Sequence, residues 1–220
     1  MVPVPNAIEF FPNDIVIGEE FSDAGQNELV VSTALKGTPV WYVDPIDGTT
    51  NFVNQRCNYA ISVGCAVDGE MEFGIVLDVA ENRCYRALKG GGAWMNGKRL
   101  HTSEVKETKD MLLTCPSVTD VFWGEYEKKQ RVFSLVKDVR AVRSLGSVAL
   151  ELCQVACGKA DLCFAVKSSP WDHNAARLIL KESGGAVWNL YGESLPYNRD
   201  TSFLAGNSEE TLAKVISEYL

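Results

Sequence analysis

The sequence has few of the residues on which several common catalytic chemistries depend. It contains only two histidines, His101 and His173, and neither a serine-elbow motif nor a C-x5-R loop, so serine-hydrolase and cysteine-phosphatase mechanisms have little support. The glycine run at residues 90–92 lacks the spacing of a phosphate-binding loop and predicts a hairpin. His173 follows Asp172 and is interpreted as a residue at a helix start rather than as a catalyst.

Basic clusters, long apolar runs and paired cysteine motifs are also missing. The formal net charge of −8 argues against nucleic acid as a partner, although a phosphorylated small molecule stays compatible because bound metal ions reverse the local field. No apolar run approaches membrane-spanning length, and residues 1–11 lack the basic region of a signal peptide. The seven scattered cysteines are expected to be reduced, buried thiols of a cytoplasmic protein.

The most informative stretch that is present is W-Y-V-D-P-I-D-G-T-T-N-F at residues 41–52. Its β-forming start predicts a strand that stops near Asp44, since Pro45 has no backbone donor. Gly48 permits a tight turn, and the amides of Gly48, Thr49 and Thr50 would then open a short helix. Amides at a helix start attract an anion such as phosphate.

Two carboxylates beside an anion site indicate that cations lie between them and the anion. Asp44, Asp47 and the Ile46 carbonyl are therefore interpreted as oxygen ligands for Mg²⁺. A shorter part of this run would be interpreted as an ordinary β-turn with polar side chains and not as a metal site, because Asp-Pro and Asp-Gly are common turn dipeptides. The whole string favours the metal and phosphate interpretation.

Elsewhere the pattern predicts strands alternating with helices, without an internal repeat. The predicted strands are residues 59–67, 72–79, 82–87, 111–115, 186–190 and 202–205, and the predicted helices are residues 125–138, 147–157, 172–183 and 208–219. A polar segment at residues 106–110 places a domain boundary there, which divides the chain into residues 1–109 and 110–220. This order predicts a layered α/β sandwich.

Four motifs in order resemble the inositol monophosphatase family, the lithium-sensitive, Mg²⁺-dependent sugar-phosphatase superfamily. They are D-P-I-D-G-T-T-N-F at residues 44–52, I-G-E-E at 17–20, R-S-L-G-S-V-A at 143–149, and W-D-H-N-A-A at 171–176 running to E-S-G-G at 182–185. The resemblance implies an αβαβα sandwich and hydrolysis of a small phosphomonoester, inositol-1-phosphate or a related polyol phosphate, by a metal-activated water. Relatives are commonly homodimers, so a homodimer is among the expectations.

The resemblance also implies the roles of individual residues. Metal ions would be held by Glu19, Asp44, the Ile46 carbonyl, Asp47 and Asp172; Glu19, Asp47 and Thr49 would be catalytic; and Gly48, Thr49, Thr50, Ser147 and Asp172 would contact the substrate. From the sequence alone, the simplest explanation of Asp172 is a helix N-cap and that of Glu19 an exposed loop acid, and only the resemblance favours the metal-binding roles. Four acids in one pocket would repel each other unless protonated or metal-bound, and Mg²⁺ suits an all-oxygen set.

The sequence departs from the family pattern at two places. Ala165 stands seven residues before Asp172, where inositol-hydrolysing relatives carry an acid that contacts substrate hydroxyls, so selection of a polyol is expected to be weaker. Only eighteen residues precede Glu19, whereas the family begins with two helices and a V-T-x-x-D segment. The chain is therefore expected to lack the first two helices and to turn over slowly. The alternatives are a histidinol phosphate or sugar bisphosphate phosphatase, or a weakly active or non-catalytic ligand-binding relative.

Overall fold

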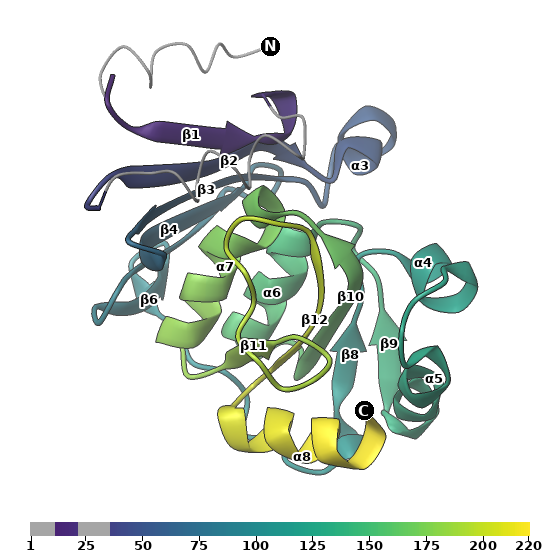
Figure 1. The fold of residues 1–220 in the computed structure, drawn as a ribbon. Helices are drawn as coiled ribbons and strands as arrows, with labels where there is room; N and C mark the ends of the chain where they lie inside the picture. Colours follow the sequence, from purple (N-terminus) through teal and green to yellow (C-terminus); the bar gives the residue numbers. More distant parts are fainter. Residues whose placement is uncertain (1–11, 22–35) are drawn as a thin grey trace.

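The computed structural model describes residues 12–21 and 36–220, which contain two β-sheets with a pair of helices between them (Figure 1). Sheet A has seven strands in the order of the sequence. They are β1 (Ile15–Gly18), β2 (Pro39–Asp47), β3 (Ala60–Val67), β4 (Glu70–Asp78), β5 (Arg83–Leu88), β6 (Gly92–Met95) and β7 (Lys98–Arg99). β1 runs parallel to β2, and every later pair is antiparallel.

The local sequence explains this meander. Along β2, Val40, Tyr42 and Asp44 are buried while the residues between them are partly exposed, which is the period-two pattern of a strand with one face on the core. Asp68 and Gly69 join β3 to β4 with positive φ angles of 52° and 78°, the conformation of a tight hairpin turn that Asp-Gly favours. The glycine run at 90–92 leads from β5 into β6, of which Gly92 is the first residue, and the two strands are antiparallel, so the predicted hairpin is confirmed.

Sheet B is built from the second half of the chain in the order β11-β12-β10-β8-β9. Its strands are β8 (Leu112–Thr114), β9 (Ala141–Arg143), β10 (Leu162–Ser168), β11 (Ala186–Trp188) and β12 (Thr201–Gly206). The helices are α3 (Thr49–Asn54), α4 (Val118–Trp123), α5 (Lys129–Asp138), α6 (Val148–Ala156), α7 (Pro170–Glu182) and α8 (Glu209–Tyr219), with 3₁₀ turns η1 (Glu19–Phe21) and η2 (Thr108–Asp110).

The elements stack as layers, which confirms the predicted sandwich. α7 packs on β2 to β6 of sheet A, and α6 packs on β10 and β12 of sheet B, so these two helices form the layer between the sheets (Figure 1). α4 and α8 contact sheet B, and α5 packs beside α8, which places the outer helices beyond that sheet. The expectation about the N-terminal helices lies outside the described residues. None of the helices that the structure describes is long and apolar enough to cross a membrane.

The predicted boundary between residues 109 and 110 falls in η2, where the chain passes from sheet A to sheet B. One apolar core nevertheless contains side chains of both halves, such as Tyr42 and Val76 from sheet A with Leu152 and Ile179 from the central helices. A second core, which includes Leu113 and Phe164, lies between sheet B and the outer helices. The division into two domains therefore stays a prediction about independent folding.

Three sequence predictions need correction. β2 does not stop near Asp44 but continues to Asp47, because its pairing with β3 shifts by one residue between Asp44 and Asp47 and such a bulge accommodates Pro45 without loss of a ladder hydrogen bond. The helix predicted at residues 125–138 begins only at Lys129, and α4 was not predicted. All seven cysteines are free thiols, but Cys57, Cys84 and Cys157 are only partly buried.

Candidate active site

The four acids predicted to bind metal come from three elements that the fold brings to one end of the central helix layer. Gly18 at the end of β1 pairs with Val43 of β2, so Glu19 follows directly beside Asp44. Asp44 pairs in turn with Ser62 of β3. The Ser62 hydroxyl donates to the Trp171 carbonyl at 3.0 Å, which ties the first turn of α7, and with it Asp172, to the same strands.

Glycines in sheet A allow α7 to approach closely enough for this arrangement. A methyl group built on Gly74 would lie 2.9 Å from the Ala175 Cα and 3.0 Å from its carbonyl carbon. On Gly64 it would lie 3.3 Å from both the Cα and the amide nitrogen of Ala175. Ordinary van der Waals contact begins near 3.4 Å, so the depth at which Asp172 lies against sheet A depends on these two glycines.

Asp47 is held at the start of α6. Its carboxylate accepts hydrogen bonds from the Ser147 hydroxyl at 2.5 Å, the Ala149 amide at 2.7 Å and the Val148 amide at 3.3 Å. Ser147 is the N-cap of α6, and its hydroxyl oxygen also accepts from the Leu150 amide at 3.2 Å. Burial raises the pKa of Asp47 to about 6, while these hydrogen bonds favour the charged form.

The other two buried acids are perturbed more strongly. Burial, followed by the nearby charge of Asp47, raises the pKa of Asp44 to about 7 and that of Asp172 to about 8, and Glu19 adds to both shifts. Among the described residues no lysine or arginine forms an ion pair with any of these four acids. The described part of the protein therefore offers no cationic side chain that would neutralise these acids when they ionise.

A divalent cation fits this donor set. Each of the three aspartates has two oxygens, and backbone amides occupy only part of their accepting capacity. Mg²⁺ prefers ligands that are all oxygen atoms, and here no nearby cationic side chain competes for them. As the side chains lie, no group of three or more His, Cys, Asp and Glu residues in the described ranges is arranged ready to hold a metal ion. The aspartate oxygens accept hydrogen bonds from neighbouring amides instead.

The predicted phosphate turn follows Asp47 directly. Gly48 has φ +90°, and an added Cβ there would lie 3.0 Å from the Asn58 carbonyl oxygen and 3.3 Å from the Ser147 Cβ, so only glycine suits the position. The Thr49 hydroxyl donates to the Ile46 carbonyl at 3.1 Å. Thr49 and Thr50 are exposed at the first turn of α3, where helix geometry supplies no acceptor for their amides.

The start of α7 differs from the prediction. Asp172 is not the N-cap; the N-cap is Ser169, the helix begins at Pro170, and the Asp172 carboxylate accepts from the Ser169 amide at 2.8 Å. Proline is favoured in the first helical position, which moves the helix start upstream. His173 lies in the first turns of α7, as interpreted, and is fully buried with its Nδ1 3.0 Å from the Ser168 hydroxyl. Burial lowers its pKa to about 3.

Sequence reasoning missed two buried polar residues that tie the loops of the site together. The Asn51 side chain donates to the Asn58 carbonyl at 2.8 Å and to the Leu145 carbonyl at 2.6 Å. The Glu151 carboxyl accepts from the Leu145 amide at 2.5 Å. The signal for Glu151 was present, since it is a single acid in the apolar helical run V-A-L-E-L-C, a position that requires a buried partner.

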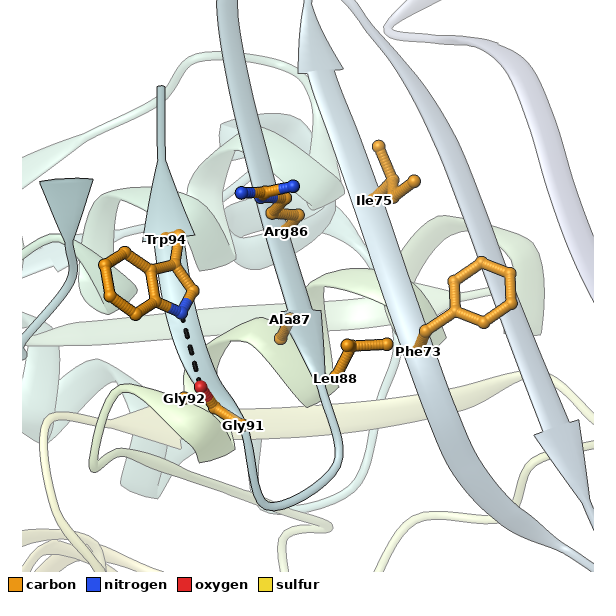
Figure 2. Close-up of a pocket in the computed structure, with 8 residues that line it drawn as sticks. All are labelled: Phe73, Ile75, Arg86, Ala87, Leu88, Gly91, Gly92 and Trp94. Atoms are coloured by element: carbon orange, nitrogen blue, oxygen red, sulfur yellow. Dashed lines mark hydrogen bonds between the residues drawn. The ribbon is translucent and has the colours of Figure 1, made fainter. Parts of the chain in front are cut away.

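A pocket of about 310 Å³ lies elsewhere, on the face of sheet A opposite the central helices (Figure 2). Its lining is mainly apolar and includes Phe73, Ile75, Leu88 and Trp94, with Arg86 as its one charged side chain. The same view shows these side chains directed away from the helices behind the sheet. None of the predicted site residues lines this pocket.

Known proteins resemble this chain in both sequence and fold. The sequence model of the inositol monophosphatase family matches residues 6–220. The inositol-1-monophosphatase of Bacillus subtilis is 39% identical over 200 residues, covering 90% of this chain and 72% of that protein. The fructose-1,6-bisphosphatase/inositol-1-monophosphatase of Thermotoga maritima is 33% identical over 211 residues, covering 96% and 76%.

Solved structures agree with the sequence relatives. The crystal structure of the inositol monophosphatase II of Staphylococcus aureus superimposes with a TM-score of 0.84 at 32% identity, covering 98% of this chain and 77% of that one. The matched relatives are phosphoric monoester hydrolases by name, and the family match extends over almost the whole chain. This protein belongs to the inositol monophosphatase family.

Proposed function

We propose that this chain hydrolyses inositol-1-phosphate or a related polyol phosphate with Mg²⁺ bound among Glu19, Asp44, the Ile46 carbonyl, Asp47 and Asp172. The observation that supports this most directly is the cluster of buried acids with raised pKa values and without a cationic partner among the described residues. It lies next to a glycine turn with accessible amides. Bound Mg²⁺ would neutralise these acids, activate water and offset the charge of the phosphate.

The residues of the chain then have separate tasks. The first-turn amides of α3 at Thr49 and Thr50 bind the phosphate oxygens, since phosphoryl transfer depends mainly on positioning and charge neutralisation. The Thr49 hydroxyl, now hydrogen-bonded to the Ile46 carbonyl, orients the attacking water. Ser147 keeps Asp47 in place through its short hydrogen bond and lies beside the turn at Gly48, close to where the substrate would bind.

Ala165 bears on the choice of substrate. It is 1% exposed and pairs with Phe203 of β12, so its methyl group is part of the core and offers no hydrogen bond to a substrate hydroxyl. A site that lacks such a partner distinguishes poorly between polyols. A sugar bisphosphate is therefore the second candidate substrate, and one relative is named for both fructose-1,6-bisphosphate and inositol phosphate hydrolysis.

Three further properties belong to this proposal through the family. Lithium would inhibit the reaction, the protein would be a homodimer, and it would act in the cytoplasm. All three are expectations that rest on membership of the family alone. The aromatic side chain of Phe52 and the side chain of Val53, both exposed on α3, offer apolar surface next to the site for a second subunit.

The test is phosphate release from a panel of inositol, sugar, histidinol and nucleotide phosphates, with and without Mg²⁺ and Li⁺. The proposal predicts Mg²⁺-dependent release with inositol-1-phosphate among the best substrates, and inhibition by Li⁺. Preference for fructose-1,6-bisphosphate or histidinol phosphate would change the assigned substrate and leave the proposed Mg²⁺-dependent reaction unchanged. Absence of release from a folded, Mg²⁺-binding protein would support a non-catalytic ligand-binding role instead.

A further inference from the structure

Both backbone polar groups of one residue next to the site, Leu145, are held by buried side chains that the proposed reaction does not use. The Leu145 amide donates to Glu151 of α6 at 2.5 Å, and the Leu145 carbonyl accepts from Asn51 of α3 at 2.6 Å. Glu151 is fully buried and Asn51 is 8% exposed. Because Glu151 and Asn51 are buried, these two hydrogen bonds fix the Leu145 backbone more firmly than bonds exposed to solvent would.

The Leu145 backbone connects directly to the acids. Only Gly146 separates Leu145 from Ser147, whose hydroxyl donates to Asp47. A Cβ on Gly146 would lie 2.8 Å from the Asn51 side-chain nitrogen, and one on Gly48 would lie 3.2 Å from the Gly146 carbonyl oxygen. Residues 145–147 are therefore packed between Asn51 and the phosphate turn, and a displacement of Leu145 reaches Ser147 and Asp47.

Glu151 is a costly residue for α6 if its only role is to fill space. Along α6, Leu150, Leu152 and Cys153 are buried and apolar. Burial raises the pKa of the Glu151 carboxyl to about 7, although this carboxyl faces the loop, where the Leu145 and Gly146 amides and the Thr114 hydroxyl favour its charged form. Its Oε2 makes no hydrogen bond of ordinary geometry among the described residues. Burying this carboxyl group opposes folding, whereas a leucine of similar size would favour it. The function of Glu151 is thus to be sought in the loop that it holds.

We propose that Glu151 is a positioning residue of this active site, which together with Asn51 holds the backbone of Leu145 so that Ser147 stays in place against Asp47. The inference deepens the proposed function and rests on it for the effect on turnover. The positioning itself concerns only the loop of residues 143–147 and is measurable without substrate.

Three variants separate positioning from general stability. Glu151→Gln keeps an oxygen that accepts from the Leu145 amide, Glu151→Leu removes it at similar volume, and Leu152→Ala is the matched control, a buried α6 residue outside the site. Each is measured for deuterium exchange of the segment 143–147, for the melting temperature, and for kcat and KM with saturating Mg²⁺.

The expected results differ between the variants. In Glu151→Leu the segment 143–147 exchanges faster than in the wild type and kcat falls about 10- to 100-fold with a smaller change in KM, because misplacement of a catalytic group by about 1 Å costs on the order of 100-fold. Glu151→Gln keeps slow exchange and a kcat within about threefold of the wild type. Leu152→Ala melts earlier but keeps the wild-type kcat and slow local exchange.

Exchange of 143–147 in Glu151→Leu that equals the wild type overturns the inference, and so does an unchanged kcat in an active protein. If the wild type has no phosphatase activity, the proposed function fails while the exchange measurement still decides the positioning. If Glu151→Leu does not fold, Asn51→Ala removes the other hydrogen bond of the Leu145 backbone and is expected to accelerate exchange of the same segment; slow exchange there contradicts the inference.

Discussion

Gly74→Ala tests whether the contact between α7 and sheet A sets the position of Asp172. Gly74 lies in β4 with an ordinary extended backbone, so the new methyl group brings no conformational strain of its own. Its nearest neighbour would be the Ala175 carbonyl oxygen, and the Ala175 Cα would lie at 2.9 Å, both inside the 3.0 Å below which surrounding atoms must shift. α7 must therefore move outward, and overpacking of this kind costs about 1–3 kcal/mol.

The displacement is expected to reach Asp172, which lies one helical turn before Ala175. Because a misplacement of about 1 Å costs on the order of 100-fold in rate, a shift that relieves these contacts predicts a kcat lower by about 10- to 100-fold. The melting temperature is expected to fall by about 2–4 °C for each kcal/mol. Both are measured on the same preparation, by thermal unfolding and by phosphate release with saturating Mg²⁺.

Gly69→Ala is the matched control. Gly69 has φ +78° with no atom within 4 Å of an added Cβ, so alanine there costs about 1–2 kcal/mol of backbone strain without displacing α7. It should lower the melting temperature and leave kcat unchanged. A Gly74→Ala protein that is destabilised but turns over like the wild type would refute the argument that this contact positions Asp172.

Further predictions follow from the same contacts. Ser147→Ala removes the cap of α6 and the hydrogen bond to Asp47, so calorimetry should show a free energy of unfolding lower by about 2–4 kcal/mol. Ser147→Thr should restore it, and an unchanged free energy of unfolding in Ser147→Ala would contradict the geometry. In EDTA, the free energy of unfolding should fall as pH rises from about 4 to 8. The reason is that folded Asp44 and Asp172 keep their protons up to pKa values of about 7 and 8, whereas the unfolded chain releases them near 3.9. Saturating Mg²⁺ should flatten this slope, and a free energy of unfolding that rises with pH would refute the assignment. Asp172→Asn should raise the melting temperature in EDTA at pH 8 and weaken Mg²⁺ binding in isothermal titration, whereas unchanged binding would remove Asp172 from the ligand set.

The sequence was a good guide where one local pattern determines one element. The β-forming residues at the start of the run 41–52 predicted the strand β2, the glycine run at 90–92 predicted a hairpin, and Gly48 predicted the tight turn before α3. These features depend on neighbours within a few residues, so the chain encodes them without reference to the fold.

The incorrect or missing predictions concern features that depend on contacts between separate parts of the chain. β2 continues past Pro45 because β3 accommodates a bulge, which no local rule predicts. The contacts of Leu145 with Asn51 and Glu151 join residues separated in the sequence by 94 positions on one side and 6 on the other. The closeness of the four acids was implied by family resemblance, and their mutual effect on pKa became visible only in the folded arrangement.

The central claim is that these acids bind Mg²⁺ to hydrolyse a small phosphomonoester. The most direct measurement is phosphate release from inositol-1-phosphate as Mg²⁺ is titrated, with the wild type and Asp47→Asn side by side. The account predicts release that starts from near zero without Mg²⁺, rises to saturation in the wild type and stays near zero in the variant. Release without Mg²⁺, or equal release from Asp47→Asn, would contradict it.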